Sequence, residues 1–188
     1  MVLLSMIKKW KLIESKVDKD YRVFKIKAEM ALSPRTNQVG TFYTIDTNDW
    51  VNIVPLTESG EVVMIRQYRH GSKEINLEIP GGLVDDEHHQ EAALRELLEE
   101  TGYTGENIRL LGSVNPNPAI FNNLCHTYLV ENVKKVAEKN LDPQEDIEVV
   151  LTPIQSVPSL IEKGIITHAL VLIGFYFYFM KSPAKNNV

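Results

Sequence analysis

Apolar side chains recur at every second position from Phe24 to Leu32, a period that predicts a half-buried β-strand. The polar stretch SPRTNQVG follows, and TFYTI after it predicts a second strand paired with the first. VNIVPL and VVMIRQY flank TESGE, which predicts a hairpin with Gly60 in the turn. Further short strand candidates are NLEIP, RLLGSV, HTYLV and IEVVLTPI.

Helical signals are confined to three segments. They cover residues 88–101, then SVPSLIEK closed by Gly164, then a last helix from about Thr167, which is a predicted N-cap. Many short strands with few helices predict a mixed sheet with helices packed on it, an α/β (α+β) or α/β/α arrangement. We expect a small N-terminal β appendage over residues 1–48 and a second domain over residues 49–188.

Composition narrows the class of protein. With 188 residues, 44% hydrophobic and 24% charged, the chain is typical of a globular protein. A pI near 5.6 without a basic stripe argues against a nucleic-acid partner. The apolar stretch ALVLIGFYFYFM is shorter than the ~20 residues that span a bilayer, so we expect a buried terminal helix and no membrane partner. A single cysteine and no apparent signal peptide favour a cytoplasmic protein.

Negative charge is concentrated in one segment. Residues 85–100 hold seven acids and one base, Arg95, for a net charge of −6, whereas the whole chain carries −5, which leaves +1 elsewhere. At about 100° per residue, a helical wheel separates two faces. The predicted core face holds Leu94, Leu97, Leu98 and Thr101, and three carboxylates converge on the other face: Glu96, Glu99 and Glu100.

Two interpretations of these carboxylates stay open on spacing alone: a solvated acidic face, or a site for hard divalent cations, which prefer oxygen ligands. Gly81 and Gly82 lie just upstream, where glycines let backbone carbonyls approach an ion or a phosphate closely. A calcium-binding loop is excluded, because the segment lacks the D-x-[DN]-x-[DN]-G form.

The spacing of these residues resembles the Nudix box, G-x5-E-x7-R-E-U-x-E-E-x-G-U, and every fixed position is filled. The matching residues run from Gly81 through Glu87 and then from Arg95 to Tyr103, with Gly102 as the last glycine. The resemblance implies an α/β/α sandwich that hydrolyses nucleoside diphosphates linked to another moiety, using Mg²⁺ or Mn²⁺. It implies metal ligation by Glu96, Glu99 and Glu100, and a pair between Arg95 and Glu87 that orients the helix.

One departure concerns the glycine pair. In many relatives the box glycine is the second of the pair, and the residue before it offers its carbonyl to a metal. Here the count to Glu87 works only from Gly81, although Gly82 follows it. Either Pro80 donates the carbonyl, or the loop LVDD is one residue shorter and Gly81 donates it. We favour Gly81 as the metal ligand.

Sequences on both sides of the box resemble the ADP-ribose pyrophosphatase group of nucleoside diphosphate sugar hydrolases. Pro118 lies 16 residues beyond Gly102, as a proline does in that group. This implies cleavage of ADP-ribose to AMP and ribose 5-phosphate. GDP-mannose or another nucleoside diphosphate sugar is an alternative substrate, and a non-catalytic module that senses ADP-ribose is an alternative function.

The same resemblance suggests roles outside the box. Glu145 matches a loop glutamate that orients or deprotonates the attacking water, Arg69 an arginine that contacts the diphosphate, and Trp10 an aromatic that stacks on adenine from a partner subunit. Relatives are commonly homodimers whose N-terminal strands cross, so we expect a homodimer. We expect solvated side chains at His88 and His89, and structural roles for Cys125 and His126, which enter a strand.

Overall fold

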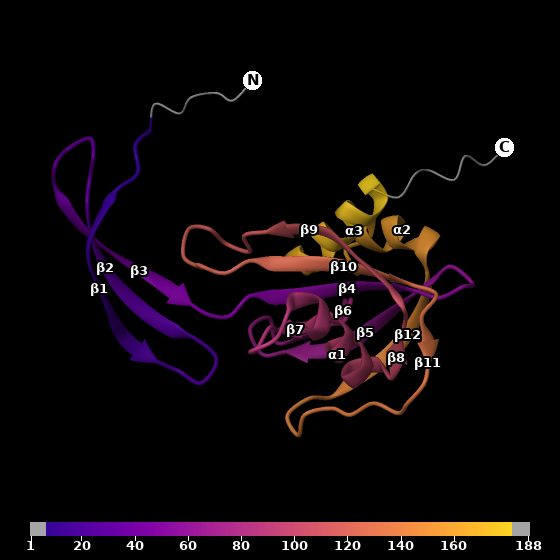
Figure 1. Cartoon of the computed structure of the whole chain (residues 1–188). Helices are drawn as coiled ribbons and strands as arrows, with labels where there is room; N and C mark the ends of the chain where they lie inside the picture. The colour runs from indigo at the N-terminus through magenta and orange to yellow at the C-terminus, as the bar shows by residue number, and fades with distance from the viewer. Residues whose placement is uncertain (1–6, 182–188) are drawn as a thin grey trace. The chain divides into compact units, whose positions relative to one another are not determined.

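The computed structural model describes residues 7–181 (Figure 1). Its elements, in chain order, are β1 (Lys11–Asp20), β2 (Lys25–Leu32), β3 (Val39–Asp46), β4 (Trp50–Leu56), β5 (Glu61–Arg69), β6 (Glu74–Glu78), β7 (Gly81–Leu83), α1 (His89–Thr101), β8 (Tyr103–Thr104), β9 (Asn107–Val114), β10 (Cys125–Glu131), β11 (Lys134–Lys135), β12 (Ile147–Pro153), the 3₁₀ turn η1 (Ile154–Ser156), α2 (Val157–Glu162) and α3 (Ala169–Lys181).

Backbone contacts divide the chain into two compact units. Among the described residues, the first comprises 7–48 together with 115–123, and the second comprises 49–114 and 124–181. Segment 115–123 joins the first unit, where Ile45 donates its N–H to the carbonyl of Ile120 and bridges Phe121. The sequence had placed this segment in the second domain, because nothing in its composition indicates that contact.

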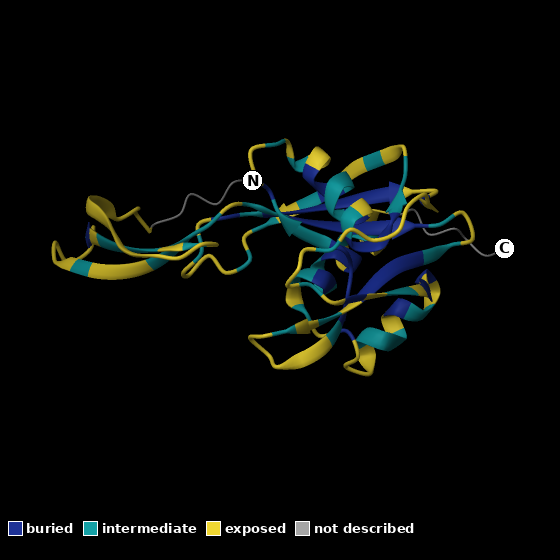
Figure 2. Ribbon diagram, turned by 90° about the horizontal axis from the view of Figure 1, so that it is seen from below, coloured by how far each residue is buried: buried dark blue, intermediate teal, exposed yellow. Residues whose placement is uncertain are grey.

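The first unit is a three-stranded antiparallel sheet in the order β1-β2-β3. The alternation over 24–32 correctly predicted β2, and TFYTI predicted β3. β1 was not predicted, because all ten of its residues are exposed and its sequence KLIESKVDKD has no period of two. Figure 2 shows this unit mostly exposed or intermediate.

The second unit is built on a mixed seven-stranded sheet. Its main path runs β12-β5-β4-β10-β9, with β6 beside β5 and β7 beside β4. β10 runs parallel to β4, and the other pairs are antiparallel. The turn between β4 and β5 holds Gly60 at φ 81°, as the hairpin predicted.

Helices cover both faces of this sheet, and alternate residues of β4 point to different layers. Val51 and Ile53 pack with α1, whereas Val54 and Leu56 pack with α2 and α3. The result is an α/β/α sandwich, as predicted from the sequence, with buried residues concentrated in the strands of this unit (Figures 1 and 2).

The terminal helix differs from its prediction in two ways. α3 begins at Ala169, and its first backbone bonds are accepted by His168 rather than by Thr167. It was expected to be buried, but Tyr176 and Met180 are 55% and 67% exposed, because only one side of the helix meets the sheet. Within residues 7–181, the helices are all too short or too polar to cross a membrane.

Candidate active site

Helix α1 presents its carboxylates toward the sheet as well as toward solvent. Glu100 is buried at 3% exposure and accepts the N–H of Gly81 at 2.9 Å. The side chain of Glu96 is 14% exposed and that of Glu99 is 38% exposed. The segment is therefore not a simple solvated acidic face, since one carboxylate belongs to the interior of the unit.

The predicted core face of this helix was partly wrong. Leu97 and Thr101 are buried, but Leu98 is 37% exposed, and Ala92 and Ala93 are fully buried in its place. The buried arc is thus rotated from the leucines toward the carboxylates. The cause is tertiary contact, because β7 approaches α1 on the carboxylate side.

The glycine pair makes that approach possible. A Cβ on Gly81 would overlap the carbonyl oxygen of Val51 and lie 2.9 Å from Oδ1 of Asn52. A Cβ on Gly82 would overlap the carboxylate of Glu96. Strand β7 can therefore pair with β4 only with glycine at position 81, and Glu96 can keep its present position only with glycine at position 82.

The guanidinium of Arg95 donates hydrogen bonds to four residues next to the carboxylates of α1. Its Nη2 contacts Glu87 Oε1 at 2.7 Å, and its Nη1 contacts Glu96 and Glu99 at 2.9 and 3.0 Å. Nη2 also donates to the carbonyl of Leu83 at 3.2 Å. The bond to Glu87, with the charges of the other two acids, holds the pKa of Arg95 above its ordinary value, so the guanidinium stays charged.

Electrostatics at the carboxylates favour an added cation. Burial raises the pKa of Glu100 to about 8, and the charges of Glu96 and Glu145 add to the rise. Burial also raises the pKa of Glu96, against the opposing effect of Arg95. Glu145, in the loop before β12, thus lies within electrostatic range of both. The oxygen-only donors and excess negative charge fit a hard divalent cation.

Arg69 also belongs to this electrostatic environment. Its guanidinium makes a bidentate pair with Glu78, at 3.0 Å through Nε and 2.8 Å through Nη2. Burial opposes its charge, but Glu78, Glu100 and Glu145 raise the pKa of Arg69. Glu78 is 2% exposed and was missed by the sequence analysis. The available signal was an acid inside the otherwise apolar run LEIP.

Gly102 closes the helix that carries these residues. It adopts φ 76° and donates its N–H to the carbonyl of Leu98 at 2.8 Å, a left-handed C-cap. A Cβ there would overlap the carbonyl of Ala137, so both backbone conformation and space require glycine.

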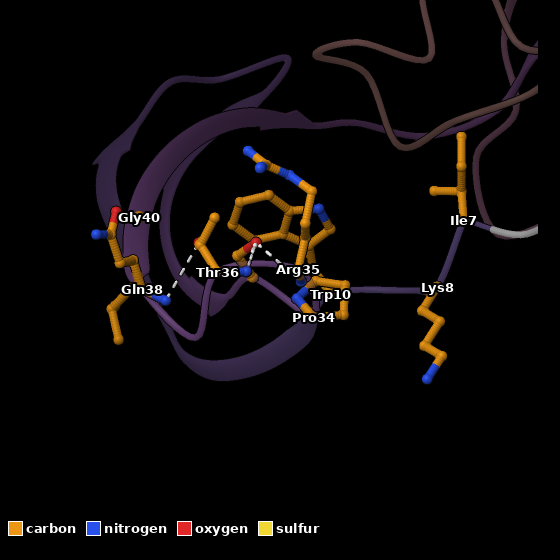
Figure 3. Close-up of a pocket in the computed structure, with 10 residues that line it drawn as sticks. Ile7, Lys8, Trp10, Pro34, Arg35, Thr36, Gln38 and Gly40 are labelled. Atoms are coloured by element: carbon orange, nitrogen blue, oxygen red, sulfur yellow. Dashed lines mark hydrogen bonds between the residues drawn. The ribbon is translucent and has the colours of Figure 1, made fainter.

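Trp10 lies in the first unit, beside a pocket of about 740 Å³ (Figure 3). Its indole packs edge-on against Phe42, with ring centroids 5.2 Å apart, and is 48% exposed. Ser33 accepts the N–H groups of Arg35 and Thr36, at 3.3 Å each, which shapes the loop that lines the pocket.

The histidines differ from their prediction. His89 was expected to be solvated, but its ring stacks on that of His126 at 3.9 Å, and both approach Asp49. His88 precedes α1 and donates its N–H to the side chain of Glu91, a capping contact. No sequence spacing links Asp49, His89 and His126, which come from three separate elements.

The second unit therefore gathers the Nudix-box residues, Arg69 and Glu145, whereas Trp10 belongs to the first unit. Known proteins resemble this chain in sequence and in fold. The model of the NUDIX domain matches residues 47–172. A solved structure described as an ADP compounds hydrolase superposes with a TM-score of 0.83 over 94% of this chain and 96% of its own, at 20% identity, a likeness of fold.

Curated relatives carry several names. An ADP-ribose pyrophosphatase of Bacillus subtilis is 31% identical over 114 residues, 60% of this chain and 62% of its own length. A methanol dehydrogenase activator of Bacillus methanolicus is 31% identical over 129 residues, 67% of this chain and 70% of its own. A mouse ADP-sugar pyrophosphatase is 36% identical over 87 residues, 44% and 39% of the two chains.

The chain thus spans less than two thirds of the B. subtilis and mouse proteins. The family assignment does not depend on those lengths. The matched domain covers most of this chain, and it contains the complete box, whose three carboxylates Glu96, Glu99 and Glu100 lie on α1. The chain belongs to the Nudix family.

Proposed function

We propose that this protein hydrolyses the diphosphate bond of an ADP-sugar, and that ADP-ribose is its substrate, giving AMP and ribose 5-phosphate. The observation that carries the proposal is the carboxylate pair Glu96 and Glu100, set against a glycine pair that leaves no room for a side chain. Relatives named for ADP-ribose and ADP-sugar pyrophosphatase activity support the choice of nucleotide.

The proposed holders of the divalent cation, Mg²⁺ or Mn²⁺, are Glu96, Glu99, Glu100 and the carbonyl of Gly81. When bound, the cation neutralises diphosphate charge and lowers the pKa of a coordinated water. The preference for Gly81 over Pro80 is supported by the Pro80 carbonyl, which already accepts the N–H of Ile53 at 2.9 Å. The burial of Glu100 supports the site, because a buried carboxylate beside others needs positive charge to stay ionised.

Arg95 and Glu145 have the proposed catalytic roles around this set. Arg95 holds Glu96 and Glu99 in place through its bonds to both, and its pair with Glu87 orients the helix. Glu145 orients or deprotonates the attacking water. The water oxygen bonds to one phosphorus and gives up a proton to Glu145 or to solvent. The bridging P–O bond breaks, and the bridging oxygen leaves with the second phosphate.

Arg69 and Trp10 are the proposed substrate contacts. The side chain of Arg69 is 41% exposed, and Glu78 holds its Nε and Nη2, which leaves Nη1 for a phosphate oxygen. Trp10 offers a half-exposed indole beside the pocket, which suits stacking on a planar base (Figure 3).

We also propose that the N-terminal β appendage, residues 1–48, joins two copies of the chain into a homodimer, and that residues 49–188 form the hydrolase domain of each copy. The exposed apolar side chains of its sheet support this, since a three-stranded sheet needs a covered face for stability. They include Leu12, Ile13, Val17, Val39, Phe42 and Tyr43. Light scattering coupled to size exclusion measures the molar mass, and a monomer at micromolar concentration contradicts the dimer.

A cytoplasmic location is part of the same proposal. The single cysteine, Cys125, is buried and unpaired, which suits a reducing compartment.

The test is phosphate release in a phosphatase-coupled assay with ADP-ribose, GDP-mannose, UDP-glucose and NADH, each with Mg²⁺, with Mn²⁺ and with EDTA. We expect metal-dependent cleavage concentrated on ADP-ribose. Glu99→Gln removes a proposed cation ligand and Glu145→Gln removes the proposed base, and each should lower kcat/KM by roughly 100-fold or more. Glu58→Gln, on the exposed β4–β5 turn, is the matched control and should retain activity.

Three other outcomes contradict parts of the proposal. Preference for GDP-mannose keeps the mechanism and replaces the substrate. Turnover that persists in EDTA removes the cation from the reaction. Binding of ADP-ribose without turnover of any compound rejects the enzyme and leaves the sensing module.

A further inference from the structure

Three residues that the proposed reaction does not use form a second ligand cluster in the Nudix domain. Asp49 precedes β4, His89 opens α1, and His126 is the second residue of β10. One ligand atom from each lies within 4.8 Å of the others. Nε2 of His126 lies 3.2 Å from Oδ2 of Asp49, and Nε2 of His89 lies 3.4 Å from the same oxygen.

Two further contacts fix the orientation of the side chains in this cluster. Nδ1 of His126 contacts the hydroxyl of Ser113 at 2.7 Å, and the histidine is 8% exposed. Oδ1 of Asp49 accepts the N–H of Leu124 at 2.7 Å, so Oδ2 is the oxygen that faces both histidines. Such contacts behind the ligands fix ring orientation and tautomer in metal sites.

Three ligand atoms converge in this cluster. His126 contacts Ser113 through Nδ1 and Asp49 through Nε2, so both of its ring nitrogens are engaged. His89 brings a second imidazole nitrogen to the same carboxylate oxygen. A metal ion that replaces the proton between these atoms would find two imidazole nitrogens and one carboxylate oxygen as ligands.

The spacing matches one class of metal. Zinc binds imidazole nitrogen and carboxylate oxygen at about 2.0–2.2 Å, which places the ligands of a tetrahedral site about 3.4 Å apart. Two of the three separations here are 3.2 and 3.4 Å. The third, between the two histidines, is at most 4.8 Å, and the side chain of His89 is 42% exposed, so a rotation that shortens this distance meets little obstruction. Two imidazoles and one carboxylate suit Zn²⁺ and its borderline neighbours better than Mg²⁺.

We propose that Asp49, His89 and His126 form a transition-metal site, separate in chemistry and position from the carboxylates of α1. On the helix, His89 lies seven residues before Glu96, about 10 Å along the axis. β4 and β10 are parallel neighbours whose first residues, Trp50 and Cys125, are in register. A metal here clamps the start of α1 to the starts of both strands.

The test is a calorimetric titration of Zn²⁺ into the tag-free full-length chain in buffer saturated with Mg²⁺, which occupies sites that prefer oxygen ligands. We expect one Zn²⁺ per chain and a rise in Tm on binding. His89→Gln should weaken binding at least tenfold, whereas His88→Gln, the neighbouring histidine outside the cluster, should leave it unchanged. Ser113→Ala should weaken binding by roughly 10- to 100-fold, the effect of a lost second contact on a ligand.

Two further measurements separate this site from the carboxylates. Glu96→Gln should keep Zn²⁺ binding intact, and Co²⁺ should give visible absorption bands typical of low coordination that disappear in His89→Gln. The proposal is overturned by absence of Zn²⁺ binding, by equal weakening in His88→Gln and His89→Gln, or by loss of Zn²⁺ in Glu96→Gln. His89 is half-exposed on a helix, so its substitution tests the site even if His126→Gln fails to fold.

Discussion

The two glycines of β7 should respond differently to the same added methyl group. In Gly81→Ala the new Cβ meets the carbonyl oxygen of Val51, which is sheet backbone and cannot move without breaking the β4–β7 pairing. In Gly82→Ala the three atoms nearest to the new Cβ all belong to the end of the Glu96 side chain, which can rotate away. The first substitution should therefore damage the fold, and the second should damage the site.

The expected magnitudes follow from these contacts. Overpacking against fixed atoms costs about 1–3 kcal/mol, and Gly81→Ala should fall at the upper end because its obstacle is backbone. Gly82→Ala should change the free energy of unfolding by less than about 1 kcal/mol, since neither glycine has a positive φ. Displacing the Glu96 carboxylate by about 1 Å should lower kcat/KM roughly 100-fold.

Urea unfolding followed by circular dichroism measures the first effect, and ADP-ribose cleavage with Mg²⁺ measures the second. Gly71→Ala is the matched control, because a Cβ there meets nothing within 4 Å. It should be neutral or stabilise by about 0.4–1 kcal/mol. Equal destabilisation by Gly81→Ala and Gly82→Ala, or full activity of Gly82→Ala, would refute the argument from contacts.

Two other predictions concern the interior. Phe175 lies on the buried side of α3, so Phe175→Ala should lower the free energy of unfolding in urea by about 3–5 kcal/mol. Tyr176 lies on the exposed side of the same helix, so Tyr176→Ala should lower it by less than about 1 kcal/mol. Cys125 is buried, and burial, with the charge of Asp49, raises the pKa of its thiol to about 12. A disulfide reagent at pH 8 should therefore label it only after denaturation, and rapid labelling of the native protein would contradict its burial.

Local sequence patterns predicted much of the fold. They failed for the features whose structure depends on contacts between residues that are far apart in the chain. The period of two over 24–32 and the TESGE hairpin predicted β2, β4 and β5, because burial of one face or a tight turn leaves a local pattern. β1 left no such pattern, since its residues are all exposed. The complete box placed the candidate carboxylates, but the Asp49 cluster was missed, because its members lie 40 and 37 residues apart.

The feature that the sequence predicted least well was which residues of α1 are buried. The physical reason for this pattern of burial bears on function. A wheel built from hydrophobicity assigns Leu98 to the core and Glu100 to the opposite face, whereas the structure exposes the leucine and buries the acid. Burying a carboxylate beside another opposes folding, as the raised pKa of Glu100 indicates. The glycine pair adds conformational entropy to the unfolded chain at the same place. Features that lower stability are concentrated at functional sites of proteins. The buried carboxylate and the glycine pair occur together here, which is an argument for a bound cation that does not depend on the Nudix-box sequence.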